Sequence, residues 1–353
     1  MERRHSEKSI VLDRLDRGIL RALTYDARLS FAALADALSI SEQTVKRRYD
    51  AMVRSGMARV FVMENMQVVG LPRWYLRLRP SPGEARHLAD LLAAHQDISW
   101  VGEVSGGTEV VAIYRPQSES ARDDLLRDRL PRTAAVAELQ AHSLVFRYPC
   151  DRGMPGTHDA LDEAQEARVR ELADPAHRVV DLLDQPPAGA TAPLDGIDRG
   201  IVAELERDGR TPYAAVARAV GISPARVSQR VAAMVRAGRL HFDLDLSMPA
   251  LGYGQYMQLY LSCAPSAVDR AGRALARAEE VPFVGMATGP ANLIASAVFR
   301  DDLHVHEFVT GTLGGIHGIT SMELVPVTRP VKLARSFHAG AGLSPVPPAR
   351  VTR

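Results

Sequence analysis

The spacing of apolar residues in this chain changes from helical to strand-like, and the same succession then occurs a second time. Near the start, apolar residues recur every three or four positions, which is the period of a helix with one buried face: Leu12, Leu15, Ile19 and Leu23. A second short helix can begin at Ser30 and a third at Ser41, because a serine hydroxyl accepts hydrogen bonds from the free N–H groups of a first helical turn. Two helices joined by a short turn predict a helix-turn-helix motif.

An internal repeat organises the chain. The segment LDRLDRGIL at 12–20 returns as LDGIDRGIV at 194–202, and the match continues without a gap at an offset of 182 residues. This offset places Arg28 on Arg210, Ser41 on Ser223, Arg48 on Arg230 and Gly56 on Gly238. Val101-Gly102 matches Val284-Gly285 at an offset of 183, so the duplication extends beyond the helices. The chain is therefore predicted to be two copies of one two-part unit.

The third helix of each copy has an apolar face and a polar face. The apolar face is expected to pack inward, through Val45, Tyr49, Met52 and Val53 in copy one and Val227, Val231, Met234 and Val235 in copy two. The polar face offers donors for base edges and cations for phosphates, as a helix in the major groove of DNA requires. The residues expected to contact DNA are Gln43, Thr44, Lys46, Arg47 and Arg48, with Arg226, Ser228, Gln229 and Arg230.

A run of cations on a helix is by itself more often a solvated face than a binding surface. The run Lys46-Arg47-Arg48 lies on the third helix of a repeated module, and this context favours DNA contact. Copy two matches the run with Ser228-Gln229-Arg230, so copy one is expected to be the stronger binder. The net charge of the whole chain is only +1, so DNA affinity must come from such local patches.

The second half of each copy changes to strand-like patterning. After Gly56 and Gly238, the stretches ARVFVME and RLHFDLD predict a strand, as in a short wing or hairpin. Beyond them, each copy has the order strand, helix, strand, strand, helix, strand. The fold class is therefore α+β, with two winged helix-turn-helix domains and two ferredoxin-like βαββαβ domains in tandem. Such a sheet has helices on one face, and another sheet, from the second copy or another chain, must cover the other face.

The expected domain boundaries follow these patterns. The winged helix-turn-helix domains are expected at 1–62 and 192–246, the α/β effector and dimerisation domains at 63–150 and 247–334, a charged helical linker at 151–191 and a mobile C-terminal tail at 335–353. Glu166 and Arg170 lie four residues apart in the linker, which is a favourable spacing for a charge pair on a helix. The tail is rich in small residues and proline.

Composition narrows the remaining possibilities. Cys150 and Cys263 lie far apart, so neither a disulfide framework nor a thiolate zinc site is indicated. His304 and Glu307 can converge on one side of a helix but His306 points away, so no metal site is expected. No cofactor motif is present, and no apolar run approaches the length of a membrane span or a signal peptide. The protein is expected to be cytoplasmic, with no membrane partner.

Nearly the whole chain resembles a tandem duplication of the Lrp/AsnC (feast/famine) family of bacterial transcription regulators. The resemblance rests on LDxxDxxIL, the Ile-Ser before each third helix, the arginines in RRYDAMVRSG and QRVAAMVRAG, and the turns Asp26-Ala27-Arg28 and Asp208-Gly209-Arg210. It implies a DNA-binding regulator that forms homo-oligomers through its α/β domains. The implied partners are double-stranded DNA and a small effector such as an amino acid.

The same resemblance implies an effector region at a glycine-bearing connection between two strands. The connection reads SGGTE at 105–109 and TGPAN at 288–292, and the implied effector-binding residues are Gly106, Gly107, Thr108, Glu109, Thr288, Gly289 and Asn292. Family members commonly have Asp at the last position, so Glu109 and Asn292 leave the identity of the effector open. The alternative is that these glycines only form tight turns between adjacent strands.

An enzyme is the alternative function, because siroheme decarboxylases resemble fused Lrp/AsnC-like units of similar length. Those enzymes have an Arg-containing, Asn-Met-Val-Trp-like segment after the DNA-binding-like part. The corresponding stretch here, RVFVMENMQVVGLPRW, has Asn65-Met66 without that continuation. The basic third helix also has no evident use in a decarboxylase. A regulator without enzymatic activity is therefore the expectation.

Overall fold

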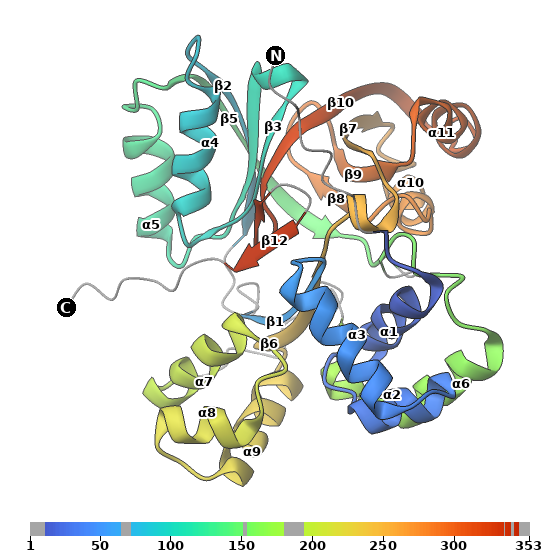
Figure 1. Ribbon diagram of the computed structural model, residues 1–353. Helices are drawn as coiled ribbons and strands as arrows, with labels where there is room; N and C mark the ends of the chain where they lie inside the picture. Colours follow the sequence, from blue (N-terminus) through green and yellow to red (C-terminus); the bar gives the residue numbers. More distant parts are fainter. Residues whose placement is uncertain are drawn as a thin grey trace, which may run out of the picture.

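Each half of the chain begins with three helices and a strand. The computed structural model describes residues 11–64, 72–150, 154–179, 194–334, 336–339 and 342–345. Copy one contains α1 (Arg14–Tyr25), α2 (Phe31–Leu38), α3 (Glu42–Arg54) and β1 (Ala58–Glu64). Copy two contains α7 (Gly196–Arg207), α8 (Tyr213–Val220), α9 (Pro224–Arg236) and β6 (Leu240–Leu246). The two helical modules lie side by side below the large sheet in Figure 1.

The helix starts follow the predicted capping residues. Ser30, Ser41 and Ser223 each accept a hydrogen bond from the backbone of the first turn of α2, α3 and α9, and Pro224 occupies the first turn of α9. Gly56 and Gly238 follow α3 and α9 with φ of 68° and 65°. A residue with a side chain is strained in this left-handed conformation, which explains why both copies have glycine there.

The buried face of the third helix is confirmed with one exception. Val45, Tyr49 and Met52 are buried, but Val53 is 40% exposed. Val53 lies eight residues after Val45, which turns it about 80° around the helix to the edge of the buried face. In copy two, Val227, Val231 and Met234 are buried and Val235 is half-buried.

The strand after each third helix pairs with its counterpart in the other copy. β1 and β6 are antiparallel, with Ala58 opposite Leu246 and Glu64 opposite Leu240. The central pair is Phe61 and Asp243, which are themselves 182 residues apart, so the axis of the internal two-fold passes through them. The wing or hairpin strand predicted from the sequence therefore forms, and its partner comes from the distant copy.

A reciprocal pair of arginines, which we call the arginine clasp, joins the two helical modules. Arg28 donates to the backbone oxygens of Gly209 and Thr211, and Arg210 donates to those of Ala27 and Leu29 at 2.7 and 2.8 Å. Each guanidinium also lies over an aromatic ring of the other module: Arg28 at 4.1 Å from the Tyr213 centroid and Arg210 at 4.9 Å from that of Phe31.

Part of the stretch between the copies packs on the first module. Within the expected linker 151–191, α6 (Glu163–Leu172) contacts α2 and α1. Glu166 binds Arg21 at 2.7 Å and Arg170 at 3.5 Å, the second being the predicted helical charge pair. The helix thus adds a fourth helix to the first module, for which the second module has no equivalent among the described residues.

The α/β modules show the predicted βαββαβ order. The first contains β2 (Arg73–Pro80), α4 (Ala85–Ala94), β3 (Ile98–Val104), β4 (Glu109–Tyr114), α5 (Glu119–Asp123) and β5 (Val136–Arg147). The second contains β7 (Gln255–Cys263), α10 (Val268–Ala276), β8 (Phe283–Ala287), β9 (Leu293–Phe299), α11 (Asp302–Glu307) and β10 (Ile319–Lys332). Wider helical turns, Asp124–Arg129 and Phe308–Leu313, extend α5 and α11.

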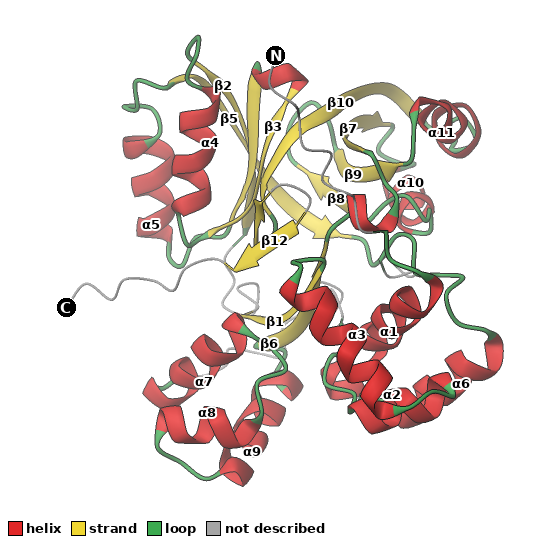
Figure 2. Cartoon of the chain, viewed as in Figure 1, coloured by secondary structure: helices red, strands yellow, loops and turns green. Residues whose placement is uncertain are grey.

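The two sheets join edge to edge into a closed arrangement. The strand order is β10-β3-β4-β2-β5-β8-β9-β7, and β7 also pairs with β10. The long strands β5 and β10 each pair within their own module and with an edge strand of the other, β8 and β3 respectively. The helices lie outside the strands (Figure 2). The expectation that a second sheet covers the open face is thus met within one chain, and no exposed edge remains in this ring of strands.

The C-terminal stretch departs from the expected mobile tail. β11 (Ser336–Ala339) and β12 (Gly342–Pro345) extend the sheet beyond β10. The Leu343 N–H donates to the oxygen of Gly56 at 2.6 Å, and Leu343 is buried. The expectation is therefore corrected for these residues, because the backbone finds hydrogen-bond partners that the composition does not reveal; residues 346–353 lie outside the described part.

No helix in the described part of the chain has both the length and the apolar character needed to cross a membrane.

The arginine clasp predicts a stability effect. The double variant R28A/R210A removes four hydrogen bonds from charged donors and leaves partly buried carbonyls unpaired, so we expect it to lose about 3 kcal/mol or more of unfolding free energy. Urea unfolding followed by circular dichroism measures this loss. The control is R54A, which removes an exposed arginine at the end of α3. Equal midpoints for the double variant and the control would contradict the clasp.

Candidate functional site

The exposed face of α3 presents two cations to solvent. Lys46 and Arg47 are exposed, and among the described residues neither takes part in a hydrogen bond or an ion pair. Gln43 is exposed beside them, whereas Thr44 is half-buried with its hydroxyl 2.8 Å from that of Ser41. The helix thus offers both side-chain amide and cationic groups to solvent from its N-terminal half, the part that reads bases in helix-turn-helix proteins.

Arg48 and Arg230 have another role from the one expected. The Arg48 guanidinium lies 2.6 Å from Asp13 and 3.0 Å from Asp16, the two residues that cap α1. Arg230 binds Asp195 and Asp198 at 2.8 and 2.7 Å in the same way. Because these charges are already paired, the repetition of this arginine is explained by the packing of the third helix on the first. We therefore remove both from the expected DNA contacts.

The matching face of α9 is less basic. Arg226, Ser228 and Gln229 are exposed. Ser228 and Gln229 occupy the positions of Lys46 and Arg47, and Arg226 occupies that of Thr44, so this face has one exposed cation against two on α3. The structure therefore keeps the difference between the two copies that the sequence predicts, with α3 as the more cationic surface.

The expected effector residues serve the strands around them. In the first connection, Gly106 and Gly107 have φ of 70° and 87°, and Thr108 donates to the oxygen of Ser105 at 3.0 Å. Glu109 accepts from Arg77 at 2.7 and 3.0 Å. These contacts are those of a tight turn between β3 and β4, together with an ion pair on the neighbouring strand.

The second connection is tied to β5 and β7. Thr288 exchanges two hydrogen bonds of 2.9 Å with the Ser143 backbone, and Asn292 does the same with the Cys263 backbone at 2.9 and 2.8 Å. At Gly289 an added Cβ would lie 2.3 Å from Nδ1 of His142, so only glycine fits. None of the seven expected effector residues lines either of the two larger cavities between the sheets and β6.

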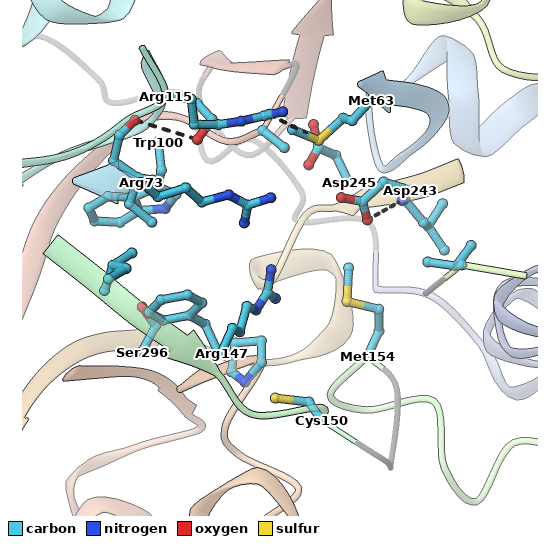
Figure 3. A pocket seen from close by; sticks show the side chains of 18 of the residues that line it. Met63, Arg73, Trp100, Arg115, Arg147, Cys150, Met154, Asp243, Asp245 and Ser296 are labelled. Atoms are coloured by element: carbon cyan, nitrogen blue, oxygen red, sulfur yellow. Dashed lines mark hydrogen bonds between the residues drawn. The ribbon is translucent and has the colours of Figure 1, made fainter. Parts of the chain in front are cut away.

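A cavity of about 230 Å³ lies between β6 and the sheets. Arginines from three places in copy one line it: Arg73 begins β2, Arg115 follows β4, and Arg147 ends β5. Figure 3 shows the side chains of Arg73 and Arg147 extending into the same space from different strands. His241 and Asp243 of β6 line the same space. We call it the cationic cavity.

The buried polar side chains of this lining include Arg73 and His241. Arg73 is 8% exposed and His241 is 6% exposed. The Nε of Arg73 and the Nδ1 of His241 find no hydrogen-bond partner among the described residues. Arg115 is equally buried, and its terminal nitrogens donate to the Glu64 backbone and to the Met63 sulfur. The cavity therefore contains both anchored and unsatisfied polar groups.

Burial controls the charges around the cavity. Burial lowers the pKa of Arg73 to about 10, against the opposing effect of the Asp243 carboxylate. Burial also lowers the pKa of His241 well below its ordinary value, and the positive charges of the three arginines act in the same direction. Burial raises the pKa of Asp243, while the Leu244 N–H and the same arginines oppose that rise. The imidazole is thus held neutral beside three cations.

Both halves of the unit match known domains. The profile of the AsnC-type helix-turn-helix domain matches residues 12–53 and 194–235, and that of the Lrp/AsnC ligand binding domain matches residues 258–337. An uncharacterized HTH-type transcriptional regulator of Pyrococcus furiosus is 30% identical over 131 residues, covering 37% of this chain and 88% of the relative. The regulatory protein AsnC of Escherichia coli K12 is 29% identical over 150 residues, covering 39% of this chain and 96% of the relative.

The chain belongs to the Lrp/AsnC family. Its relatives match about two fifths of its length, while the helix-turn-helix profile matches it twice, so this Lrp/AsnC protein is a tandem-duplicated form.

A duplicated Lrp/AsnC-like fold is also known in a solved structure. The siroheme decarboxylase NirDL superposes with a TM-score of 0.62 over 92% of this chain and 93% of its own, at 15% identity. The same enzyme in complex with an iron-uroporphyrin III analogue superposes with a TM-score of 0.60. At this level of identity the likeness is one of fold.

Sequence reasoning missed the cationic cavity of this Lrp/AsnC protein. One signal was present: in β6, the polar residues His241, Asp243 and Asp245 alternate with Phe242 and Leu244. Such alternation ordinarily indicates a strand with one face in water. Here the polar face lines the cavity, and no local pattern links it to Arg73 or Arg147.

The buried neutral His241 predicts acid sensitivity. Its folded pKa lies below the ordinary 6.5, so the stabilisation is present above about pH 6.5 and is lost as the pH falls further. We expect the wild type to lose more unfolding free energy between pH 7.5 and 5.5 than His241→Gln, as measured by urea titrations. The raised pKa of Asp243 has the opposite effect on stability, which it increases as the pH falls. Because Asp243 is present in both proteins, its contribution largely cancels when the two are compared. The exposed His87, replaced by Gln, is the control; an equal loss in H241Q and wild type would contradict this assignment.

Proposed function

We propose that this Lrp/AsnC protein is a transcription regulator that places α3 in the major groove of duplex DNA. The observation that supports this most strongly is the exposed pair Lys46 and Arg47, which have no protein partner among the described residues. The pair lies within the part matched by the helix-turn-helix profile. Two free cations on a helix that fits the groove give an electrostatic contribution to binding that a paired surface cannot supply.

The internal two-fold supports simultaneous presentation of two helices. The β1–β6 ladder and the arginine clasp join the modules within one chain, so the separation of α3 and α9 does not depend on protein concentration. Arg226 and Gln229 are exposed on α9. This helix would therefore contribute contacts with phosphates rather than recognise a second set of bases. Association of chains into homo-oligomers and a cytoplasmic location remain predictions.

Sensing of a small molecule is the second part of the proposed function. The Lrp/AsnC ligand binding profile matches copy two, and the ring of strands lies next to the β1–β6 ladder that joins the DNA-binding modules. An effector that binds better to one arrangement of the modules than to another would shift DNA affinity by that difference in free energy. An amino acid at the glycine-bearing connections remains one possible form of this effector.

Replacing the free cations should weaken DNA binding without unfolding the protein. We expect K46A/R47A to bind a duplex selected from random sequences 10- to 100-fold less tightly. The slope of log affinity against log salt should fall by about two, since each phosphate contact contributes about 0.9. Fluorescence anisotropy of the labelled duplex measures both quantities.

The matched control is R127A/R132A, which removes the same number of charges from exposed positions on the first α/β module. Unfolding midpoints are measured for both variants. A wild-type protein with no affinity for any selected duplex, or equal affinity and slope in the two double variants, would refute DNA binding through α3.

A decarboxylase-like enzyme that acts on a tetrapyrrole is the second candidate function. Two observations favour it: the superposition with NirDL over 92% of the chain, and the buried arginines and histidine of the cationic cavity. The volume opposes it, since about 230 Å³ is below the range of pockets for drug-sized ligands and a tetrapyrrole is larger still. The comparison segment with Asn65-Met66 lies outside the described residues.

Titration with siroheme separates the two candidates. For a regulator we expect no saturable shift in the absorption of siroheme and no decarboxylated product by mass spectrometry. A saturable shift that Arg73→Ala abolishes, together with product formation, would establish the enzyme instead.

A further inference from the structure

Through the internal repeat, the three arginines of the cationic cavity correspond to residues that line a neighbouring cavity of different chemistry; the two cavities share Asp245 and Tyr256. The pairs Leu76–Ala112 and Leu259–Ala295 show that the sheets superpose at an offset of 183 residues. At this offset, Arg73, Arg115 and Arg147 correspond to Tyr256, Val298 and Pro330. These three line a cavity of about 270 Å³, which we call the apolar cavity. Where copy one has three cations, copy two therefore has none.

The strands β1 and β6 also differ in the charge and polarity of corresponding residues. At the offset of 182, His241, Asp243 and Asp245 of β6 correspond to Arg59, Phe61 and Met63 of β1. All three positions change in charge or polarity. By contrast, the residues that hold the modules together are the same in both copies, as Arg28 and Arg210 or Arg48 and Arg230 show. Of the three β1 residues only Met63 lines a cavity, and it is the cationic one. The two copies have thus diverged at the arginines of the cationic cavity and in the β1–β6 ladder, and they agree where they join the modules.

The cationic cavity has the chemistry of an anion site. Removing a guanidinium from water is costly unless a charged partner replaces the water, and Arg73 is both buried and left with an unpartnered Nε. A planar carboxylate accepts two parallel N–H groups of a guanidinium, as a phosphate also does. Arg73 and Arg147 approach from different strands, so one ligand can present a carboxylate to each.

The charge and the volume limit the ligand. Three arginines face Asp243 and Asp245, so the lining has a net charge of +1 when all five groups are ionised. Burial raises the pKa of Asp243, and protonation of this carboxylate brings the charge to +2, which a dicarboxylate balances. A space of about 230 Å³ accommodates a compact metabolite rather than a drug-sized molecule. We propose that the cationic cavity binds a small dicarboxylate, with one carboxylate at Arg73 and the other at Arg147. This deepens the proposed function by naming the ligand class, and it rests on that function only for the step from ligand binding to DNA.

Ligand binding is measured on the full chain without DNA. Succinate, glutarate and glutamate are titrated by calorimetry and by thermal unfolding at constant ionic strength, with acetate and inorganic phosphate as comparison anions. We expect at least one dicarboxylate to bind saturably and to raise Tm by about 3 °C at one hundred times its Kd. Acetate should have no such effect.

The variants place the ligand. Arg73→Ala should reduce affinity at least 100-fold, and Arg147→Gln at least tenfold. Arg79→Ala, on the same strand but outside the cationic cavity, should leave it unchanged. If R73A does not fold, Arg73→Lys is used instead. It keeps the positive charge but lacks the two parallel N–H groups of a guanidinium, so it should still weaken binding at least tenfold.

Three results would overturn the proposal. In the first, no dicarboxylate binds more tightly than acetate; in the second, phosphate binds as tightly as every dicarboxylate. In the third, the variants of Arg73 and Arg147 bind the dicarboxylate as tightly as the wild type does. Each of these leaves DNA binding by Lys46 and Arg47 untouched. If the wild-type protein binds a dicarboxylate but no DNA, only the proposed function as a DNA-binding regulator is overturned.

Discussion

Two seven-residue strands, β1 and β6, pair antiparallel about Phe61 and Asp243, which occupy matching positions in the internal repeat. This ladder is symmetric, so it forces the two helical modules into a reciprocal arrangement. The arginine clasp follows from that arrangement, since Arg28 and Arg210 each reach the turn that contains the other. The ladder also closes the space between β6 and the sheets, where the cationic cavity lies. Both the display of α3 and the existence of the cavity therefore depend on this one pairing.

Placing both copies in one chain has a consequence that a symmetric dimer of identical chains lacks. In a dimer of identical chains, every residue near the axis occurs twice, so an arginine at one cavity is an arginine at the other. Here Arg73 can differ from Tyr256, and Asp243 from Phe61. One cavity is cationic and the other apolar, and likewise one recognition helix is more basic. The duplication keeps the symmetric scaffold while it allows asymmetric surfaces.

Much of the fold could be predicted because it depends on local sequence patterns. The caps at Ser41 and Ser223, the apolar stripe through Val45 and Met52, and the βαββαβ order all depend on neighbours within a few residues. The role of Arg48 could not be predicted in this way: its sequence context suggests a DNA contact, but its charge is paired with Asp13 and Asp16, more than thirty residues earlier. The C-terminal strands were missed for a similar reason, since Leu343 bonds to the backbone of Gly56.

The sequence by itself determined the duplication, the helix-turn-helix modules and the exposed cations Lys46 and Arg47, because periodicity and capping act over one or two helical turns. The tertiary structure alone decided which strand β1 pairs with, that the two sheets close on each other, and that Arg73, Arg147 and His241 meet in one cavity. The physical reason is distance along the chain. Backbone hydrogen bonds between strands are the same for any pair of partners, so only the burial of both copies together selects among them.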